Sequence, residues 1–472
     1  MRGKYKEIGK TVILCLLLVS TFVLAAQLWI FEELYKVTDI SDVVRLLTRQ
    51  GMYVPFSSQE VRGSKWMDEV FTPLQMVATY EDDRSFIRFE KEALPVYYAQ
   101  MRNLISDYLA RSGGMWTATA NMSVWREGMR ENSMLFNFEQ PLSLQILCQY
   151  LEMPYPEGAE TMQACCGMIL ADPEPGDIKV LFKDENAQMV YIFQSGYVEE
   201  VEAFIEEAAK DTEQMKGAFF AFEDEETHQA VVQAGISPET VFFTKPARQP
   251  VIVASNPLNA DAAGKTAAEE NVLEIFLFDA SSVRKYAALD GGLLFVENFS
   301  TLRLGADGLV EYHVTQNDRG IAVFSASATE AALLSRYDMV QGACRLLSAM
   351  GPEVFGGQAG LVYGGMEYFS ETGTYRLYFD YSFQNYAIQM PENTQNKGYP
   401  ISIDIAGGYI TGASILLRTF SADGTATYQQ PKGLMLNILR HGDYAFSLTK
   451  FGEKYVYEEE NKPMRVQYYV QA

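Results

Sequence analysis

The hydrophobic pattern begins with one long apolar run. Residues 11–31 (TVILCLLLVSTFVLAAQLWIF) carry no charge, and a helix of about 20 apolar residues spans the roughly 30 Å hydrocarbon core of a bilayer. The run therefore predicts a transmembrane helix. A cleaved signal peptide is the alternative, because Val23-Leu24-Ala25 resembles a cleavage site. The run continues past that site to Phe31, which favours the uncleaved anchor.

Charges on either side orient this predicted helix. Residues 1–10 contain Arg2, Lys4, Lys6 and Lys10, and Glu32 follows the apolar run. Positive charge is retained on the cytoplasmic side of a membrane. We therefore expect a short cytoplasmic tail, a single pass through the cell membrane and an extracytoplasmic remainder. Any output must then pass sideways, through other membrane helices or other ectodomains.

After residue 32 the periodicity switches between that of helices and that of strands, which predicts an α+β fold of several domains. The first would be an α+β region over residues 32–255, and a further division near residue 160 is left open. Its expected elements are helices over 38–50 and 85–111, the latter kinked or split by Pro95, a strand, turn and helix over 133–151, a β-hairpin from 176–183 and 188–194, a helix over 197–215 and a strand over 217–222.

Small and polar residues over 256–270 predict a linker. A central β-rich domain is expected over 271–325, with strands at 273–279, 292–299, 300–305 and 309–316. The last domain, 326–472, is predicted as a helix packed on a curved antiparallel sheet. Its helix would begin at a capping box, Ser327 to Glu330, and end near Met350. Its strands are expected at 359–369, 374–385, 399–406 and 408–420.

Composition and charge exclude several functions. The chain is 48% hydrophobic and 13% aromatic, which is enough to form buried cores. Its formal net charge is −23, although the first ten residues are basic. A body this acidic repels phosphate backbones and anionic headgroups, so nucleic-acid binding and polybasic membrane docking are disfavoured.

Cysteines and histidines do not form a recognisable site. Cys148, Cys165, Cys166 and Cys344 lie beyond the apolar run without a C-x-x-C spacing, and we interpret them as buried small hydrophobes whose pairing is left open. The histidines, His228, His313 and His441, have no ligand spacing. No metal or cofactor is therefore predicted.

The stretch around Asp279 resembles a catalytic segment, because Ser281 and Ser282 follow the acid. Catalysis would need a positioned base, and no histidine is close in sequence. A helix N-cap at Asp279 or Ser281 explains the same residues without chemistry. We therefore expect a protein that is not an enzyme.

The same segment carries a family resemblance. The run FLFDASSVRKYAALDGGLLFVEN resembles a motif of the YycH family, and the matching positions are Phe278, Asp279, Ser281, Val283, Arg284, Asp290 and Gly291. A second stretch, WREGMRENSMLFNFEQPLSLQIL from Trp125, and the N-terminal membrane helix are also similar. One departure is Phe295-Val296-Glu297-Asn298, where the family usually has Tyr-Thr-Asp-Gly.

The resemblance implies a membrane-anchored regulator in cell-wall homeostasis signalling. Members of this family act on a sensor histidine kinase of the WalK type, usually together with a YycI-like protein, and the C-terminal helix and sheet resemble the fold of YycI. The alternative is an extracytoplasmic module that binds a cell-envelope component. The sign of regulation and homodimerisation are left open.

One face of the predicted membrane helix is the candidate partner contact. It consists of Ile13, Leu17, Ser20, Thr21, Leu24 and Gln27. Hydroxyl and amide side chains on such a face can form hydrogen bonds between helices in lipid. The alternative interpretation is that Ser20 and Gln27 bond to their own backbone or to the membrane interface.

Overall fold

The computed structural model describes residues 69–87, 93–111, 116–171, 178–196, 199–211, 215–243, 248–259, 262–288, 291–323, 334–384, 386–391, 396–428 and 450–471. All of them fall within one compact unit, residues 59–472. The predicted membrane helix over 11–31, the candidate contact face on it and the predicted helix over 38–50 lie outside the described residues. None of the helices within these ranges combines the length and the hydropathy that a membrane-spanning helix needs.

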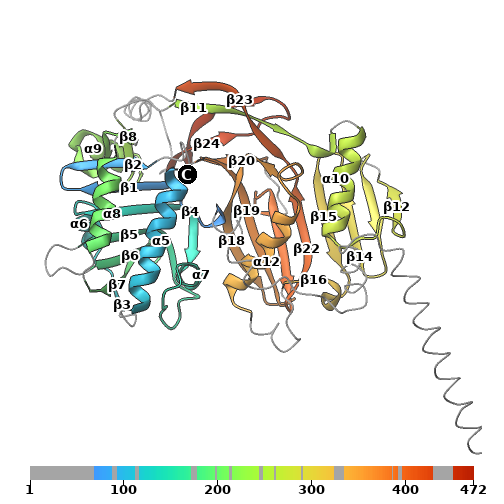
Figure 1. Ribbon diagram of the computed structural model, residues 1–472, viewed down its shortest axis with the longest axis horizontal. Helices are drawn as coiled ribbons and strands as arrows, with labels where there is room; N and C mark the ends of the chain where they lie inside the picture. Colours follow the sequence, from blue (N-terminus) through green and yellow to red (C-terminus); the bar gives the residue numbers. More distant parts are fainter. Residues whose placement is uncertain are drawn as a thin grey trace, which may run out of the picture. The chain divides into compact units, whose positions relative to one another are not determined.

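An antiparallel sheet forms the first half of the unit (Figure 1). In spatial order it contains β3 (Trp116–Thr119), β7 (Met189–Ser195), β6 (Ile178–Asp184), β5 (Gln163–Ala171), β4 (Ser133–Ser143), β1 (Gln75–Tyr80), β2 (Asp83–Ile87) and β8 (Met215–Lys216). The predicted hairpin is confirmed, because β6 and β7 pair in antiparallel register from Ile178 opposite Ser195 to Asp184 opposite Met189.

Three helices contribute to the core on one face of this sheet: α5 (Ala93–Arg111), α7 (Leu144–Tyr150) and α8 (Glu199–Lys210). In α8 the buried residues are Val201, Phe204, Ile205, Ala208 and Ala209, the spacing of a single apolar face. Its first turn is acidic and Lys210 lies in its last turn, so both ends complement the helix dipole.

The opposite face of the sheet is covered by α6 (Ser123–Gly128) and by residues 215–243, which we call the insert. The insert contains β8, β9 (Ala218–Phe220), η2 (Ala221–Glu223), α9 (Glu225–Gln233) and β10 (Val241–Phe243). It has a small core of its own and also buries Phe220 and Val241 against the sheet. Because both faces are covered, β5 and β6 are apolar on both sides.

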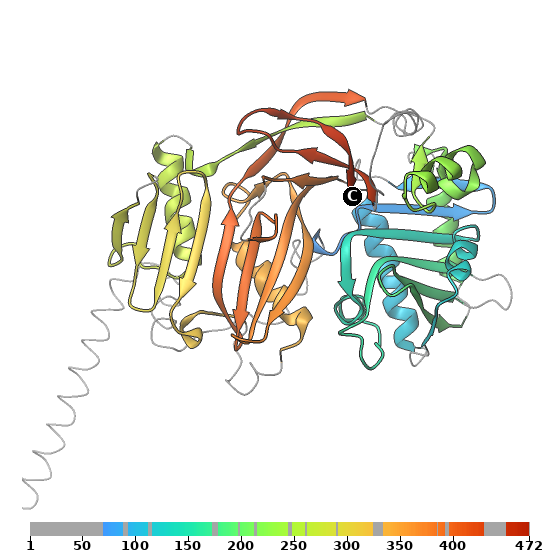
Figure 2. The ribbon, with the colours of Figure 1, turned by 180° about the vertical axis from the view of Figure 1, so that it is seen from behind.

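A larger sheet forms the second half, with its rear face visible in Figure 2. Its path runs β12 (Arg284–Ala287), β13 (Leu293–Val296), β14 (Ser300–Leu304), β15 (Leu309–Val314), β22 (Tyr409–Leu416), β21 (Ile401–Ala406), β19 (Thr374–Phe383), β20 (Tyr386–Gln389), β24 (Lys450–Val456) and β26 (Val466–Gln471), with β16 (Ile321–Ala322) beside β22 and β18 (Gly360–Phe369) beside β19. Helix α12 (Arg336–Ala349) lies over its central strands (Figure 1).

A smaller sheet connects early and late parts of the chain. It contains β17 (Gly356–Gly357), β23 (Thr419–Tyr428), β11 (Arg248–Ser255) and β25 (Pro463–Met464). Since β11 pairs with β23 and β25, the predicted boundary after residue 255 separates a strand from its partners. The α+β class is confirmed, and the division into domains stays a prediction.

Two expectations after that boundary are wrong. Most of the expected linker over 256–270 is structured: η3 (Pro257–Asn259) precedes helix α10 (Ala262–Ile275). The small residues were interpreted as a linker, but several of them are alanines, which have high helix propensity. The expected strand at 273–279 is also absent, since Leu273 and Phe276 are buried at helical spacing at the end of α10 and just beyond it.

Two helix boundaries also differ from expectation. Residues 85–111 do not form one helix, because β2 ends at Ile87 and α5 begins at Ala93. Pro95 lies in the first turn of α5, where a missing N–H costs nothing. Helix α12 begins at Arg336 with a capping box formed by Ser335 and Asp338, later than expected. The predicted box from Ser327 to Glu330 lies outside the described residues.

Candidate functional site

The family motif joins α10 to β12. Phe278 is 1% exposed and packs edge to face on Tyr312, with the ring centroids 6.3 Å apart. Its N–H donates to the carbonyl of Leu273 at 2.8 Å, which closes the end of α10. Val283 packs against the main core. These two apolar residues therefore anchor the segment.

The polar residues of the motif form a turn. Asp279 Oδ1 accepts from the N–H of Ser281 at 3.0 Å and from its hydroxyl at 2.7 Å, and Oδ2 accepts from the hydroxyl of Ser282 at 2.8 Å. The predicted helix N-cap is wrong, because β12 and not a helix follows. Arg284 begins that strand opposite Val296, Gly291 has a φ of +81°, and Asp290 lies outside the described residues. The structure thus places the motif in a hydrogen-bonded turn and a hairpin.

The histidines lie on different elements, with His228 in α9 and His313 in β15. His441 falls outside the described ranges. Among the described residues, no group of His, Cys, Asp and Glu is arranged to hold a metal ion.

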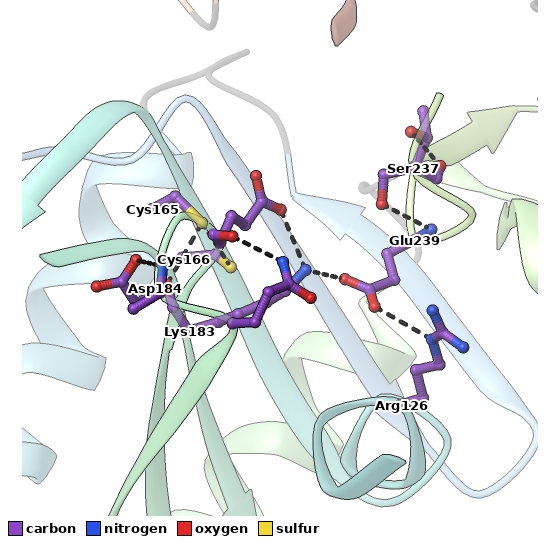
Figure 3. Close-up of polar contacts among 11 residues, drawn as sticks. Arg126, Cys165, Cys166, Lys183, Asp184, Ser237 and Glu239 are labelled. Carbon is purple, nitrogen blue, oxygen red and sulfur yellow. Dashed lines mark hydrogen bonds and ion pairs between the residues drawn. The ribbon is translucent and has the colours of Figure 1, made fainter. Parts of the chain in front are cut away.

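A largely buried ion pair with two more exposed charged neighbours lies between the first sheet and the insert (Figure 3). At its centre is Lys183 of β6, 5% exposed. Its ammonium donates to Glu239 of the insert and, at 3.1 Å, to Glu185. Glu239 also accepts from Nε of Arg126 in α6, at 3.3 Å. We call Lys183, Glu185, Glu239 and Arg126 the clamp.

Burial alone would lower the pKa of Lys183, but the carboxylates of Glu239 and Glu185, the adjacent Cys166 and the hydrogen bond to Glu239 together outweigh burial, and the pKa is raised. The lysine is therefore held as an ammonium ion, which is not a nucleophile. The buried charge of Lys183 is paired with the largely buried Glu239, as a buried ion requires, and the more exposed Arg126 and Glu185 add one further charge of each sign. The arrangement fits attachment of the insert to the sheet rather than covalent catalysis.

Two further arginines outside the insert, Arg84 and Arg130, also contact residues of the insert. Arg84 of β2 pairs with Glu223 at 2.5 Å and lies 4.6 Å from the ring centroid of Phe220. Arg130 lies 5.1 Å from the centroid of Phe222. The cations thus come from the sheet side, while Glu223, Glu239 and the two aromatic rings come from the insert.

Two thiols adjoin the clamp on β5. The sulfur atoms of Cys165 and Cys166 are 3.5 Å apart, and Cys165 donates to the carbonyl of Lys183 at 3.4 Å. Cys166 pairs with Lys183 in the β5–β6 ladder. Burial, assisted by the hydrogen bond with Cys165, raises the pKa of Cys166 well above its ordinary value. Cys148, Cys165, Cys166 and Cys344 are all free thiols.

The clamp was not predicted from the sequence, although β6 carries one signal for it. The strand IKVLFKD is apolar at successive positions, which indicates cover on both faces, so a lysine within it would be buried. Its partner could not be read from sequence, because Glu239 is 56 positions away along the chain.

Comparison with known proteins reveals similarity in structure only. No family model matches the chain, and no curated protein matches it. The crystal structure of YycH from Bacillus subtilis superposes with a TM-score of 0.53 at 10% sequence identity, covering 86% of this chain and 97% of that one. An uncharacterized protein from Eubacterium rectale covers 47% of this chain with a TM-score of 0.27, which supports no argument.

The resemblance found in the sequence is therefore confirmed at the level of structure. It extends over both halves of the described unit rather than over one motif, since 86% of the chain is covered. This chain has a YycH-like fold.

Proposed function

We propose that this protein is a non-enzymatic, membrane-anchored regulator of a sensor histidine kinase of the WalK type, acting in cell-wall homeostasis signalling. The YycH-like fold carries the proposal, because the similarity spans 97% of the known YycH chain. The kinase and a YycI-like protein are the partners that the sequence resemblance implies.

The predicted topology defines how such a regulator would act. A membrane helix over 11–31 would place residues 1–10 in the cytoplasm and the bulk of the chain outside the cell, so that this bulk reaches the kinase within the membrane or outside it. Hydrogen bonds between membrane helices contribute roughly 0.6–2 kcal/mol each. Several such contacts are enough to change the balance of a two-state kinase.

Co-purification from detergent tests the membrane face. A Ser20→Leu/Gln27→Leu variant removes the polar groups of the candidate face and should reduce kinase capture roughly tenfold, as a loss of about 1.4 kcal/mol would. The matched control is Val19→Leu/Ala26→Leu, which adds leucines at similar depth on another face. Undiminished capture by the first variant would remove the membrane-face hypothesis.

A reconstituted kinase tests regulation itself. Autophosphorylation is measured in vesicles that contain the kinase alone, the kinase with this protein, and the kinase with both this protein and a YycI-like protein. The proposal expects a change of rate in at least one mixture, and its direction gives the sign of regulation. Equal rates in all three would contradict the proposal.

A further inference from the structure

The adjacent thiols of Cys165 and Cys166 have a geometry that the proposed function does not use. Their sulfurs are in contact at 3.5 Å, whereas a disulfide bond is about 2.05 Å long. Cys165 is partly exposed and Cys166 is buried. The pair therefore has one thiol that a small oxidant can reach and a second thiol beside it.

The strand is irregular where the thiols lie. The β4–β5 register runs up to Cys166 opposite Asn137, then shifts, and resumes at Ala164 opposite Leu142. On the other side of β5, the pairing with β6 ends at Cys166 opposite Lys183. Cys165 thus has no ladder partner on either side. A rotation of the peptide between the cysteines would disturb the terminal pair of the β5–β6 ladder and the Cys166–Asn137 pair beside the register shift in the β4–β5 ladder.

That terminal pair is the one that positions the clamp. Lys183 is bonded to Glu239 of the insert, and its carbonyl accepts from Cys165. A change in the backbone at Cys166 is therefore transmitted directly to the residue that holds the insert on the sheet.

We propose that Cys165 and Cys166 are an oxidative modification site, at which a hydroperoxide forms a vicinal disulfide that loosens the insert. In the first step the sulfur of Cys165 attacks one oxygen of the peroxide, an S–O bond forms as the O–O bond breaks, and Cys165 becomes a sulfenic acid. The other oxygen takes up the thiol proton and leaves as an alcohol or water. In the second step Cys166 attacks that sulfur, the S–O bond breaks, and its proton leaves with the hydroxyl as water. Two thiols lose two electrons and the peroxide gains them.

The order of the steps follows from the environment. Cys166 is buried and stays a thiol, so oxidation begins at Cys165. Closing the small ring pulls the peptide away from extended geometry, which breaks the Cys166–Lys183 pair. A dithiol reductant reverses the modification.

Mass spectrometry and hydrogen exchange on the full-length protein test the proposal. After treatment with hydrogen peroxide, the peptide containing both cysteines should lose two hydrogen atoms and resist alkylation. Amides of the insert, residues 215–243, should exchange about tenfold faster, and reductant should restore both measurements. Cys165→Ser and Cys166→Ser should each abolish the accelerated exchange, whereas Cys344→Ser, which removes a buried thiol in α12, should leave it intact.

Two outcomes would overturn the inference. One is overoxidation of Cys165 to a sulfinic acid while Cys166 remains alkylatable. The other is formation of the disulfide with unchanged amide exchange in the insert, which would show that oxidation of the thiols does not affect the clamp.

Discussion

The ring of Phe71 stacks on the ring of Tyr337 in α12, with centroids 6.2 Å apart and an interplanar angle of 24°. The ring centroid of Phe71 also lies 4.9 Å from that of Tyr150 in α7 and 5.9 Å from that of Tyr363 in β18. Tyr150 belongs to the first half of the unit, and the other two rings to the second. A residue near the start of the described chain thus lies, fully buried, at the junction of the two sheets.

Replacing Phe71 should weaken both halves together. Phe71→Ala removes a fully buried ring, and such truncations cost about 3–5 kcal/mol. Hydrogen exchange should accelerate in α7 and in α12. The control is Phe193→Ala, an equally buried ring whose aromatic neighbour, Phe182, is in the same sheet. Its effect should stay within the first sheet, and an effect of Phe71→Ala on only one half would refute the junction.

The largely buried Lys183–Glu239 pair of the clamp should contribute to the free energy of unfolding. Among the described residues, Lys183→Met leaves the largely buried Glu239 with Arg126 as its charged partner, and breaking a buried pair costs about 3 kcal/mol. Adding Glu239→Leu removes the unpaired charge and should restore part of that loss. Urea unfolding measures both. Lys210→Met, which removes an exposed pair with Glu206, should change stability very little. Equal effects of the two lysine variants would contradict the clamp.

Sequence patterns predicted the strands of the second half best: β14 and β15 bury alternate residues, whereas β18 and β19 also contain runs of consecutive buried residues. Strands β14, β15, β18 and β19 all lie within a residue or two of the expected ranges. Side chains at successive positions of a strand face opposite sides of the sheet. A half-buried strand therefore shows alternating apolar and polar residues in its sequence. This is why the hairpins of the second half could be predicted from the chain alone.

Helix α10 and the clamp could not be predicted in the same way. The alanine-rich start of α10 carries little amphipathic signal, and LEIFLF after it alternates like a strand. Helix propensity and tertiary burial of Leu273 decided the outcome. The clamp depends on a contact between Lys183 and Glu239, which only the folded sheet and the insert bring together.

A half-buried carboxylate on β18, Glu367, should give the stability of the large sheet a pH-dependent contribution. The pKa of Glu367 is lowered, first by the hydrogen bond from Lys397 and also by that from Tyr378. The pKa of Tyr378 is raised to about 12, so its hydroxyl stays a donor throughout. A depressed carboxyl pKa stabilises the fold above the unfolded pKa, and this contribution is lost as pH falls through the folded one.

We therefore expect Glu367→Gln to be less stable than wild type near pH 7 by about 0.5 kcal/mol, because the pair is solvent-screened. The difference should disappear as the pH falls below about 4. Thermal unfolding across that range measures it, and the same scan at high salt should reduce the neutral-pH difference. A difference that grows on acidification would show that the sign is wrong.

The packing of α12 gives a prediction that is independent of charge. A Cβ atom on Gly342 would lie 2.4 Å from Cγ1 of Val323, closer than the two atoms can approach. Gly342→Ala should therefore destabilise the protein by about 1–3 kcal/mol, although alanine is the better helix former. Val323→Ala in the same chain removes the clashing methyl groups and should recover part of the loss. The double-mutant cycle is measured by urea unfolding, and strict additivity of the two changes would show that α12 does not pack on Val323 through this glycine.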